Sequence, residues 1–142
     1  GVHTVVDATR DLLVNVLQYH PFLIKPNNHE LGEIVGRTLT TDADITAAAR
    51  TLQEKGARNV LVSMAGDGAL LLDEKGEVHR IGTPKGRVVN SVGAGDSMVA
   101  GFVAGSGSYR EALRLGTACG SATAFSLGLA KKEMIDALLA TI

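Results

Sequence analysis

The residues with the clearest chemical potential lie in the stretch Asn90–Phe102, where three small residues precede an acid: Gly93, Ala94, Gly95 and then Asp96. The stretch joins a short apolar run to an apolar segment that predicts a helix. Residues without side-chain bulk let successive backbone N–H groups converge on one point, and a helix N-terminus adds partial positive charge there. Such a site suits a phosphate, and a carboxylate beside a phosphate can accept the proton of an attacking hydroxyl.

The same residues also fit a purely structural interpretation, in which Asp96 caps the helix and the glycines make a turn. This stretch by itself does not separate the two interpretations. It does differ from two familiar nucleotide-binding motifs. A dinucleotide-binding fingerprint needs a third glycine where Met98 stands, and the chain has no Gly-Lys-Ser/Thr of the Walker A type. A nucleotide would therefore be bound by another kind of loop.

The elements that must position these residues alternate between strands and helices in the first half of the chain. Apolar runs predict the strands, and apolar residues at helical spacing predict the helices. Thr41 with Asp44 forms a capping-box pattern, and Gly56 is placed to end that helix. In order, we expect a strand at 2–6, a helix through 12–17, a strand at 22–24, a helix ending at Gly36, a helix over 41–56 and a strand at 60–62. This alternation predicts an α/β fold with a mostly parallel sheet.

The pattern changes in the second half of the chain. Two apolar segments, 69–72 and 78–81, flank the turn-forming sequence Asp73–Glu77 and predict a β-hairpin. Beyond the hairpin the pattern is almost entirely helical, over 97–104, 109–125 and 131–139. The first of these helices is apolar nearly all round, so we expect it to be buried.

The charge balance and the cysteine content of the chain limit the kinds of binding partner and cellular compartment that we expect. The chain has 142 residues with 14 Lys and Arg against 15 Asp and Glu, which argues against nucleic-acid or membrane-surface binding. Cys119 is the only cysteine, so no intrachain disulfide can form and a reducing, cytoplasmic setting is expected. The first residues do not resemble a signal peptide, and the longest apolar stretch, 98–104, is too short to span a bilayer.

Asn90–Asp96 closely resembles the second signature of the ribokinase-like (PfkB) carbohydrate kinases. Three further stretches resemble the same family in the expected order. Lys25–Glu30 resembles its Asn-x-x-Glu motif, Ser63–Gly68 its nucleotide loop after a sheet strand, and Gly116–Thr123 the helix that walls its adenine pocket. The resemblance covers essentially the whole chain. It implies a ribokinase-like three-layer fold with a mostly parallel sheet, of which this chain is the C-terminal part.

The resemblance also implies roles in phosphoryl transfer from ATP with Mg²⁺. Asp96 would be the catalytic base, and the backbone of residues 93–95 would stabilise charge on the transferred group. Glu30 and Asn27 would hold Mg²⁺ through water. The residues expected to bind the nucleotide are Lys25, Asn27, Ser63, Gly66, Gly68, Thr117 and Ser121. Some members place a monovalent cation near the positions of Asn90, Val92, Thr123 and Ser126.

Several of these residues keep a structural alternative. Asn27 fits a turn, and Glu30 fits the start of a helix, where an acid is favourable. The Ser63 hydroxyl could satisfy local backbone at the end of a strand. Gly66 and Gly68 make a tight turn under either interpretation.

Within the family the chain looks most like the phosphosugar branch, which includes 1-phosphofructokinase, tagatose-6-phosphate kinase and a minor 6-phosphofructokinase. The expected reaction is the ATP-dependent phosphorylation of a phosphorylated ketose, with fructose 1-phosphate to fructose 1,6-bisphosphate as the first choice. Tagatose-6-phosphate or 6-phosphofructokinase activity is the enzymatic alternative, and a sugar or nucleoside kinase of the same family is a further one.

Family members are longer than this chain, and their sugar site and lid come largely from the N-terminal half. We therefore expect residues 1–142 to form a single nucleotide-binding α/β domain without that half, and to bind nucleotide without catalysis when alone. A sheet that starts abruptly leaves one edge and some helix faces uncovered. Self-association, such as a homodimer, is expected for that reason.

Overall fold

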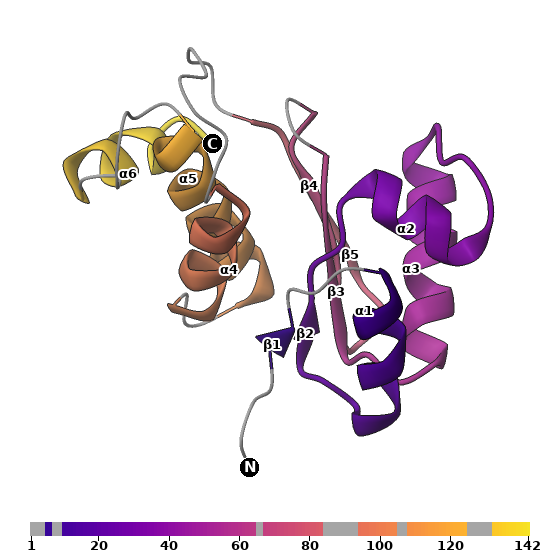
Figure 1. The fold of residues 1–142 in the computed structure, drawn as a ribbon. Coiled ribbons are helices and arrows are strands. Elements are labelled where there is room, and N and C mark those ends of the chain that lie inside the picture. Colours follow the sequence, from indigo (N-terminus) through magenta and orange to yellow (C-terminus); the bar gives the residue numbers. More distant parts are fainter. Residues whose placement is uncertain (1–4, 7–9, 65–66, 84–93, 105–107, 125–131) are drawn as a thin grey trace. The chain divides into compact units, whose positions relative to one another are not determined.

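The computed structural model describes residues 5–6, 10–64, 67–83, 94–104, 108–124 and 132–142. The chain forms two compact units. The first comprises Gly1–Met64 and Leu70–Arg80, and the second comprises Ala65–Ala69 and Ile81–Ile142. Figure 1 shows that the first unit contains the strands, whereas helices dominate the second.

One five-stranded sheet, in the order β1-β2-β3-β4-β5, organises the first unit. Its strands are β1 (Val5–Val6), β2 (Leu23–Ile24), β3 (Asn59–Ser63), β4 (Ala69–Leu72) and β5 (Val78–Ile81). β1 pairs in parallel with β2, and β2 in parallel with β3. The turn between β4 and β5 is too short for a crossover, so these two strands form the predicted antiparallel hairpin and the sheet is mixed.

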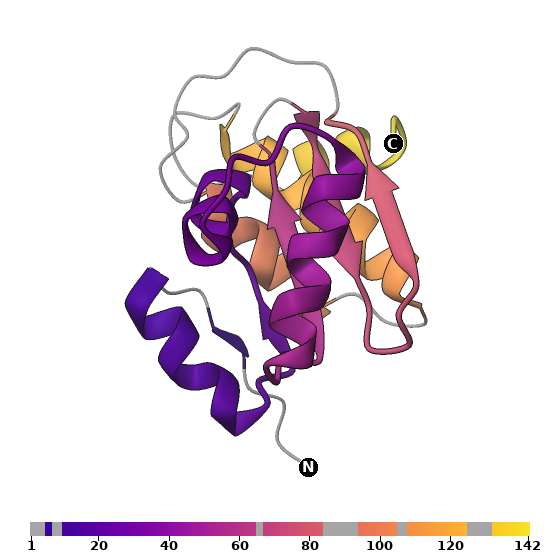
Figure 2. The same ribbon diagram turned by 90° about the vertical axis from the view of Figure 1, so that its right-hand side faces the viewer.

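The helices of the first unit cover one face of this sheet, as both views show (Figures 1 and 2). They are α1 (Arg10–Val16), the short 3₁₀ helix η1 (Leu17–Tyr19), α2 (Asn28–Val35) and α3 (Asp42–Glu54). Leu31 of α2 and Leu52 of α3 are fully buried in one core with Ile24 and Val62 of the strands. Leu61, which alternates with these strand residues, is fully buried too. Burial on both faces explains the continuous apolar runs of the sequence.

Local sequence signals set the helix ends. Thr41 Oγ1 accepts a hydrogen bond from the Asp44 N–H at 3.1 Å, and the Asp44 carboxylate accepts one from the Thr41 N–H at 3.2 Å, which completes the predicted capping box. Gly56 follows the end of α3 with a φ of 135°, and Gly36 ends α2 with a φ of 74°. Both conformations disfavour any residue with a side chain, so these two predicted helix stops are confirmed.

The second unit is built on a close helix crossing. Its helices are α4 (Ala94–Ala104), α5 (Tyr109–Ala124) and α6 (Lys132–Leu139). A Cβ atom on Gly101 of α4 would lie 2.7 Å from Cys119 Sγ, and one on Gly116 of α5 would lie 2.7 Å from the Met98 carbonyl oxygen. The two helices therefore approach at positions where only glycine fits.

Two expectations about α4 are corrected. The helix begins at Ala94 rather than at Ser97, so Gly95 and Asp96 belong to its first turn. Its complete burial was a wrong prediction, because Val103 is 54% exposed while Phe102 is buried. α4 packs closely on α5 along one side, so an all-apolar sequence did not require an all-buried helix. Phe125 and Lys131, which were predicted to lie in the next two helices, fall outside the described residues.

Within the described ranges, no helix is long and apolar enough to cross a membrane.

Candidate active site

The Asn-x-x-Glu motif forms the N-terminus of α2. Asn27 is the N-cap residue, and its Oδ1 accepts the Glu30 N–H at 2.8 Å. Its Nδ2 donates to Glu30 Oε1 at 2.5 Å. The first contact satisfies a backbone donor that the helix leaves free, and the second fixes the direction of the carboxylate. Asn27 is therefore more than a turn residue, since it also orients the side chain predicted to hold the metal waters.

The ends of β2 and β3 bring Lys25 and Ser63 to the same place. The Ser63 N–H donates to the Pro26 carbonyl oxygen at 3.1 Å, and Ser63 forms an isolated parallel bridge with Asn27. Lys25 is only 7% exposed. β2 and β3 run parallel, so these residues share the carboxyl edge of the sheet, where open α/β sheets bind ligands. The structure thus groups Lys25, Asn27, Glu30 and Ser63, and their binding roles stay predictions.

The nucleotide loop after β3 is described in part. Gly68 has a φ of 94°, and a Cβ atom on it would lie 2.0 Å from the Ile81 carbonyl oxygen. Its tight-turn role is therefore confirmed, because both the backbone conformation and the nearby carbonyl exclude a side chain. Gly66 lies outside the described residues. A nucleotide contact of either glycine stays a prediction.

The start of α4 carries the predicted anion site. Ala94 is its first residue, and Gly95 and Asp96 follow within the first turn. The first N–H groups of a helix have no intrahelical acceptor, and the helix dipole adds partial positive charge at this end. This backbone therefore suits an anion such as a phosphate. Gly93, the first residue of the predicted loop, lies outside the described residues.

The predicted adenine wall lies on α5. Thr117 and Ser121 are one turn apart and only 1% and 7% exposed. In the part of the chain that the structure describes, Thr117 Oγ1 has no hydrogen-bond partner. A buried polar group without a partner costs about 1–3 kcal/mol, and a ligand acceptor would remove that cost. This is an independent reason to regard Thr117 as a binding residue.

Of the residues predicted near a monovalent cation, only Thr123 lies in the described ranges. Its hydroxyl donates to Ser97 Oγ at 2.7 Å, so it joins the last turn of α5 to the first turn of α4. The other three positions of that prediction, Asn90, Val92 and Ser126, lie outside the described residues.

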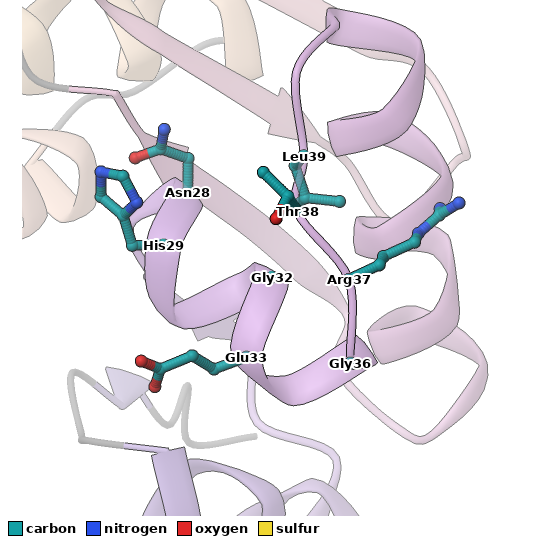
Figure 3. A pocket seen from close by; sticks show the side chains of 8 residues that line it. All are labelled: Asn28, His29, Gly32, Glu33, Gly36, Arg37, Thr38 and Leu39. Carbon is teal, nitrogen blue, oxygen red and sulfur yellow. The ribbon is translucent and has the colours of Figure 1, made fainter.

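A cavity of about 440 Å³ opens beside α2, lined by the helix and by the segment that follows it (Figure 3). Figure 3 shows Asn28 and His29 at the start of α2, while the side chain of Arg37, in the segment after the helix, points away from them. The lining residues are Asn28, His29, Gly32, Glu33, Gly36, Arg37, Thr38 and Leu39. None of the predicted site residues lines this cavity. This cavity was not predicted from the sequence, because the residues that line it match no motif or spacing of a known kind of site.

A polar cluster in the β4–β5 hairpin also escaped the sequence analysis. Asp73 is 1% exposed, its Oδ2 lies 2.8 Å from His79 Nε2, and its Oδ1 accepts the N–H groups of Lys75 and Glu77. Burial by itself would raise the pKa of Asp73, but the hydrogen bonds from His79 and from the Glu77 and Lys75 backbone outweigh it and hold this pKa below its ordinary value. Asp73, Glu77 and His79 have metal-binding atom types within 4.8 Å of one another. Both Asp73 oxygens are already occupied, so the cluster is explained as a lock on the hairpin.

The chain belongs to the pfkB family of carbohydrate kinases, whose family pattern matches residues 3–135. It is 47% identical to the 1-phosphofructokinase of Bacillus subtilis, over 98% of this chain and 46% of that protein. It is 40% identical to the D-tagatose-1-phosphate kinase of Bacillus licheniformis, over 93% of this chain and 44% of that protein. The chain thus spans about half the length of the curated relatives it matches.

A solved structure of a Staphylococcus aureus protein assigned as a phosphofructokinase superposes with a TM-score of 0.94 at 44% identity. It matches 99% of this chain, which covers 46% of that protein. The ribokinase-like α/β fold expected from the motifs is therefore confirmed. The membership of the family predicted from the same motifs is confirmed as well.

Proposed function

We propose that the full-length protein containing this chain transfers the γ-phosphoryl group of ATP to a phosphorylated ketose, and converts fructose 1-phosphate to fructose 1,6-bisphosphate. The observation that carries this proposal is the 47% identity to a 1-phosphofructokinase across 98% of the chain. The structure supports it by grouping Lys25, Asn27, Glu30 and Ser63 at one sheet edge and by placing Asp96 in the first turn of α4.

In this reaction the hydroxyl oxygen of the ketose forms a bond to the γ-phosphorus, while the bond to the bridging oxygen breaks and ADP leaves. Asp96 would accept the proton of that hydroxyl. The N–H groups of residues 93–96 would stabilise charge on the transferred group. One such donor is typically worth about 2.7–4 kcal/mol in the transition state.

The donor types at the start of α2 fit Mg²⁺, which prefers oxygen ligands and keeps several of its waters. When bound, Mg²⁺ would neutralise charge on the phosphates. Glu30 and Asn27 would hold its waters, and the Asn27 amide would keep the Glu30 carboxylate in one orientation. The nucleotide would be bound by Lys25, Ser63, Gly66, Gly68, Thr117 and Ser121.

We further infer that residues 1–142 are the nucleotide-binding portion of the enzyme, and that the remaining half supplies the sugar site. The chain alone would bind nucleotide without turnover, and it would self-associate. A monovalent cation near Thr123 belongs to the same proposal.

A coupled ADP-release assay on the full-length protein tests the reaction. The acceptors would be fructose 1-phosphate, tagatose 6-phosphate, tagatose 1-phosphate and fructose 6-phosphate, and fructose 1-phosphate should give the highest kcat/KM. A higher value for tagatose 1-phosphate would favour the second candidate function, which the 40% identity to a D-tagatose-1-phosphate kinase supports. Absence of turnover with all four would contradict the proposal.

Measurements on residues 1–142 alone test the proposal that nucleotide binding and sugar binding lie in different halves of the enzyme. Light scattering would measure self-association, and the same assay would measure turnover. Robust turnover by a monodisperse 142-residue monomer would show that the chain needs no second half.

A further inference from the structure

One side-chain hydrogen bond joins the helix that carries Asp96 to its neighbour. Thr123 Oγ1, in the last turn of α5, donates to Ser97 Oγ at 2.7 Å. Thr123 is only 6% exposed, so water competes little for this hydroxyl. Ser97 directly follows Asp96 in the chain. The bond therefore acts on the turn of α4 that holds the predicted base.

The spacing of contacts shows that this bond belongs to one register between α4 and α5, which lie side by side (Figure 1). Ser97 and Gly101 are four residues apart on α4, and their partners Thr123 and Cys119 are four residues apart on α5, in the opposite direction. Four residues are about one helical turn, so both contacts lie on the same helix face. The glycine contact fixes the distance between the helices. The Thr123 hydroxyl adds a directional contact at the N-terminal end of α4.

We propose that Thr123 is a positioning residue for the phosphoryl transfer, since its hydroxyl holds Ser97 and thereby fixes the first turn of α4 that presents Asp96 and the free N–H groups. This inference rests on the proposed function. Helix ends fray because their first N–H groups lack intrahelical acceptors. A tertiary contact at that end opposes fraying. Displacing a reacting group by about 1 Å can cost about 100-fold in rate, so the contact matters more for turnover than for binding.

The test compares Thr123→Val, which keeps the shape but removes the hydroxyl, with Thr123→Ser, which keeps the hydroxyl. In the full-length protein, we expect Thr123→Val to lower kcat about 10-fold to 100-fold with little change in the KM for ATP. Thr123→Ser should restore most of the rate. Thr51→Val is the matched control, because among the described residues the Thr51 hydroxyl bonds only to the Ala47 carbonyl within its own helix. Wild-type kcat in Thr123→Val, or equal losses in both Thr123 variants, would overturn the inference.

A double-mutant cycle separates the bond from the shape of the side chain. Ser97→Ala removes the acceptor of the same bond. The double variant Ser97→Ala with Thr123→Val should therefore have the kcat of the slower single variant and no lower value. Losses that multiply would mean that the two residues act independently, which contradicts a shared bond.

Hydrogen exchange gives a readout that does not depend on catalysis. The amides of residues 98–100, which are the first in α4 with an acceptor four residues back inside the helix, should exchange faster in Thr123→Val than in the wild type or in Thr123→Ser. If the wild type phosphorylates none of the four phosphoketoses but this exchange pattern holds, the proposed function fails while the positioning contact stands. Unchanged exchange in Thr123→Val would refute the contact itself.

Discussion

Each of the two units holds its own predicted residues in a different way. In the first unit the predicted residues hold one another, as when Asn27 caps α2 and also binds the Glu30 carboxylate. In the second unit α4 is held by packing: its glycine contacts with α5 lie beyond the first turn, and the Thr123 hydroxyl contacts Ser97 in the first turn. The hydrogen-bonded residues should therefore be sensitive to substitutions that change charge, to pH and to metal concentration. The packed helices should be sensitive to substitutions that add or remove a small side-chain volume.

The largest expected effect concerns the base on the packed helix. Asp96→Asn in the full-length protein should lower kcat about 10²-fold to 10⁴-fold and leave ATP affinity nearly unchanged, because the carboxylate acts on the sugar hydroxyl. Steady-state kinetics and nucleotide titration would measure both. The matched control is Asp136→Asn, an exposed acid of α6 that pairs with Lys132. Near-normal kcat in Asp96→Asn would end its assignment as base.

The next effect tests the packing itself. Gly116→Ala would gain about 1 kcal/mol of helix propensity, but its Cβ would lie 2.7 Å from the Met98 carbonyl oxygen, a backbone atom that cannot swing aside. We expect a net destabilisation of about 1–3 kcal/mol in chemical denaturation. Gly82→Ala is the control, since, its chain neighbours aside, no atom of the described residues lies within 4 Å of its Cβ position, and its stability should be unchanged or slightly higher. A stabilised Gly116→Ala would show that the crossing tolerates added volume.

This contrast also explains how far the sequence could predict the structure. The hydrogen-bonded features were visible because they follow short spacings. The Thr41 to Asp44 capping box and the stop at Gly56 were predicted from residues a few positions apart, and the Asn27 to Glu30 spacing was identified by its resemblance to a family motif. Such local rules operate before tertiary contacts form, so a pattern of residue types is enough to predict them.

The packed features depended on partners that are distant in the chain. The contact of Gly101 with Cys119 and the bond between Ser97 and Thr123 need the register of two helices, which no local spacing defines. The exposure of Val103 was mispredicted for the same reason, since an apolar sequence does not say which side a neighbour covers. The hairpin lock around Asp73 was missed because it depends on burial of that carboxylate.

A smaller effect concerns the stability of the first unit at low pH, where Asp73 becomes protonated. The pKa of Asp73 lies below its ordinary value of 3.8, because hydrogen bonds from His79 and the backbone outweigh the effect of burial. Its contribution to stability is therefore present above about pH 4 and is lost as the pH falls through the lowered pKa. Asp73→Asn should remove this part of the acid sensitivity, about 1–2 kcal/mol, in denaturation curves measured from about pH 6 to pH 2.

The control for this titration is Asp42→Asn, which removes an exposed acid paired with Arg80 on the same unit. Exposed pairs contribute little, so its pH dependence should match the wild type. If Asp73→Asn lost stability in acid as steeply as the wild type, the hairpin lock would not be a source of acid sensitivity.

The smallest effect concerns the metal side of the first unit. Glu30→Gln keeps the size of the side chain but replaces the carboxylate that Asn27 orients. We expect the Mg²⁺ concentration for half-maximal rate to rise by less than about 10-fold, because Glu30 acts on metal waters rather than on the ion directly. The KM for the sugar should change less. Titration of Mg²⁺ at fixed ATP in the ADP-release assay would measure the difference.

Glu33→Gln provides the matched control for this last prediction. Glu33 lies on the same helix, is exposed and lines the cavity beside α2. The Glu33→Gln substitution therefore removes the same charge from α2 without touching the contact between Asn27 and Glu30. If both variants shifted the Mg²⁺ dependence equally, the effect would come from the general negative charge of α2. If neither shifted it, Glu30 would return to a plain helix-start residue, and the orientation imposed by Asn27 would be structural only. A shift confined to Glu30→Gln would link the carboxylate that Asn27 orients to the metal.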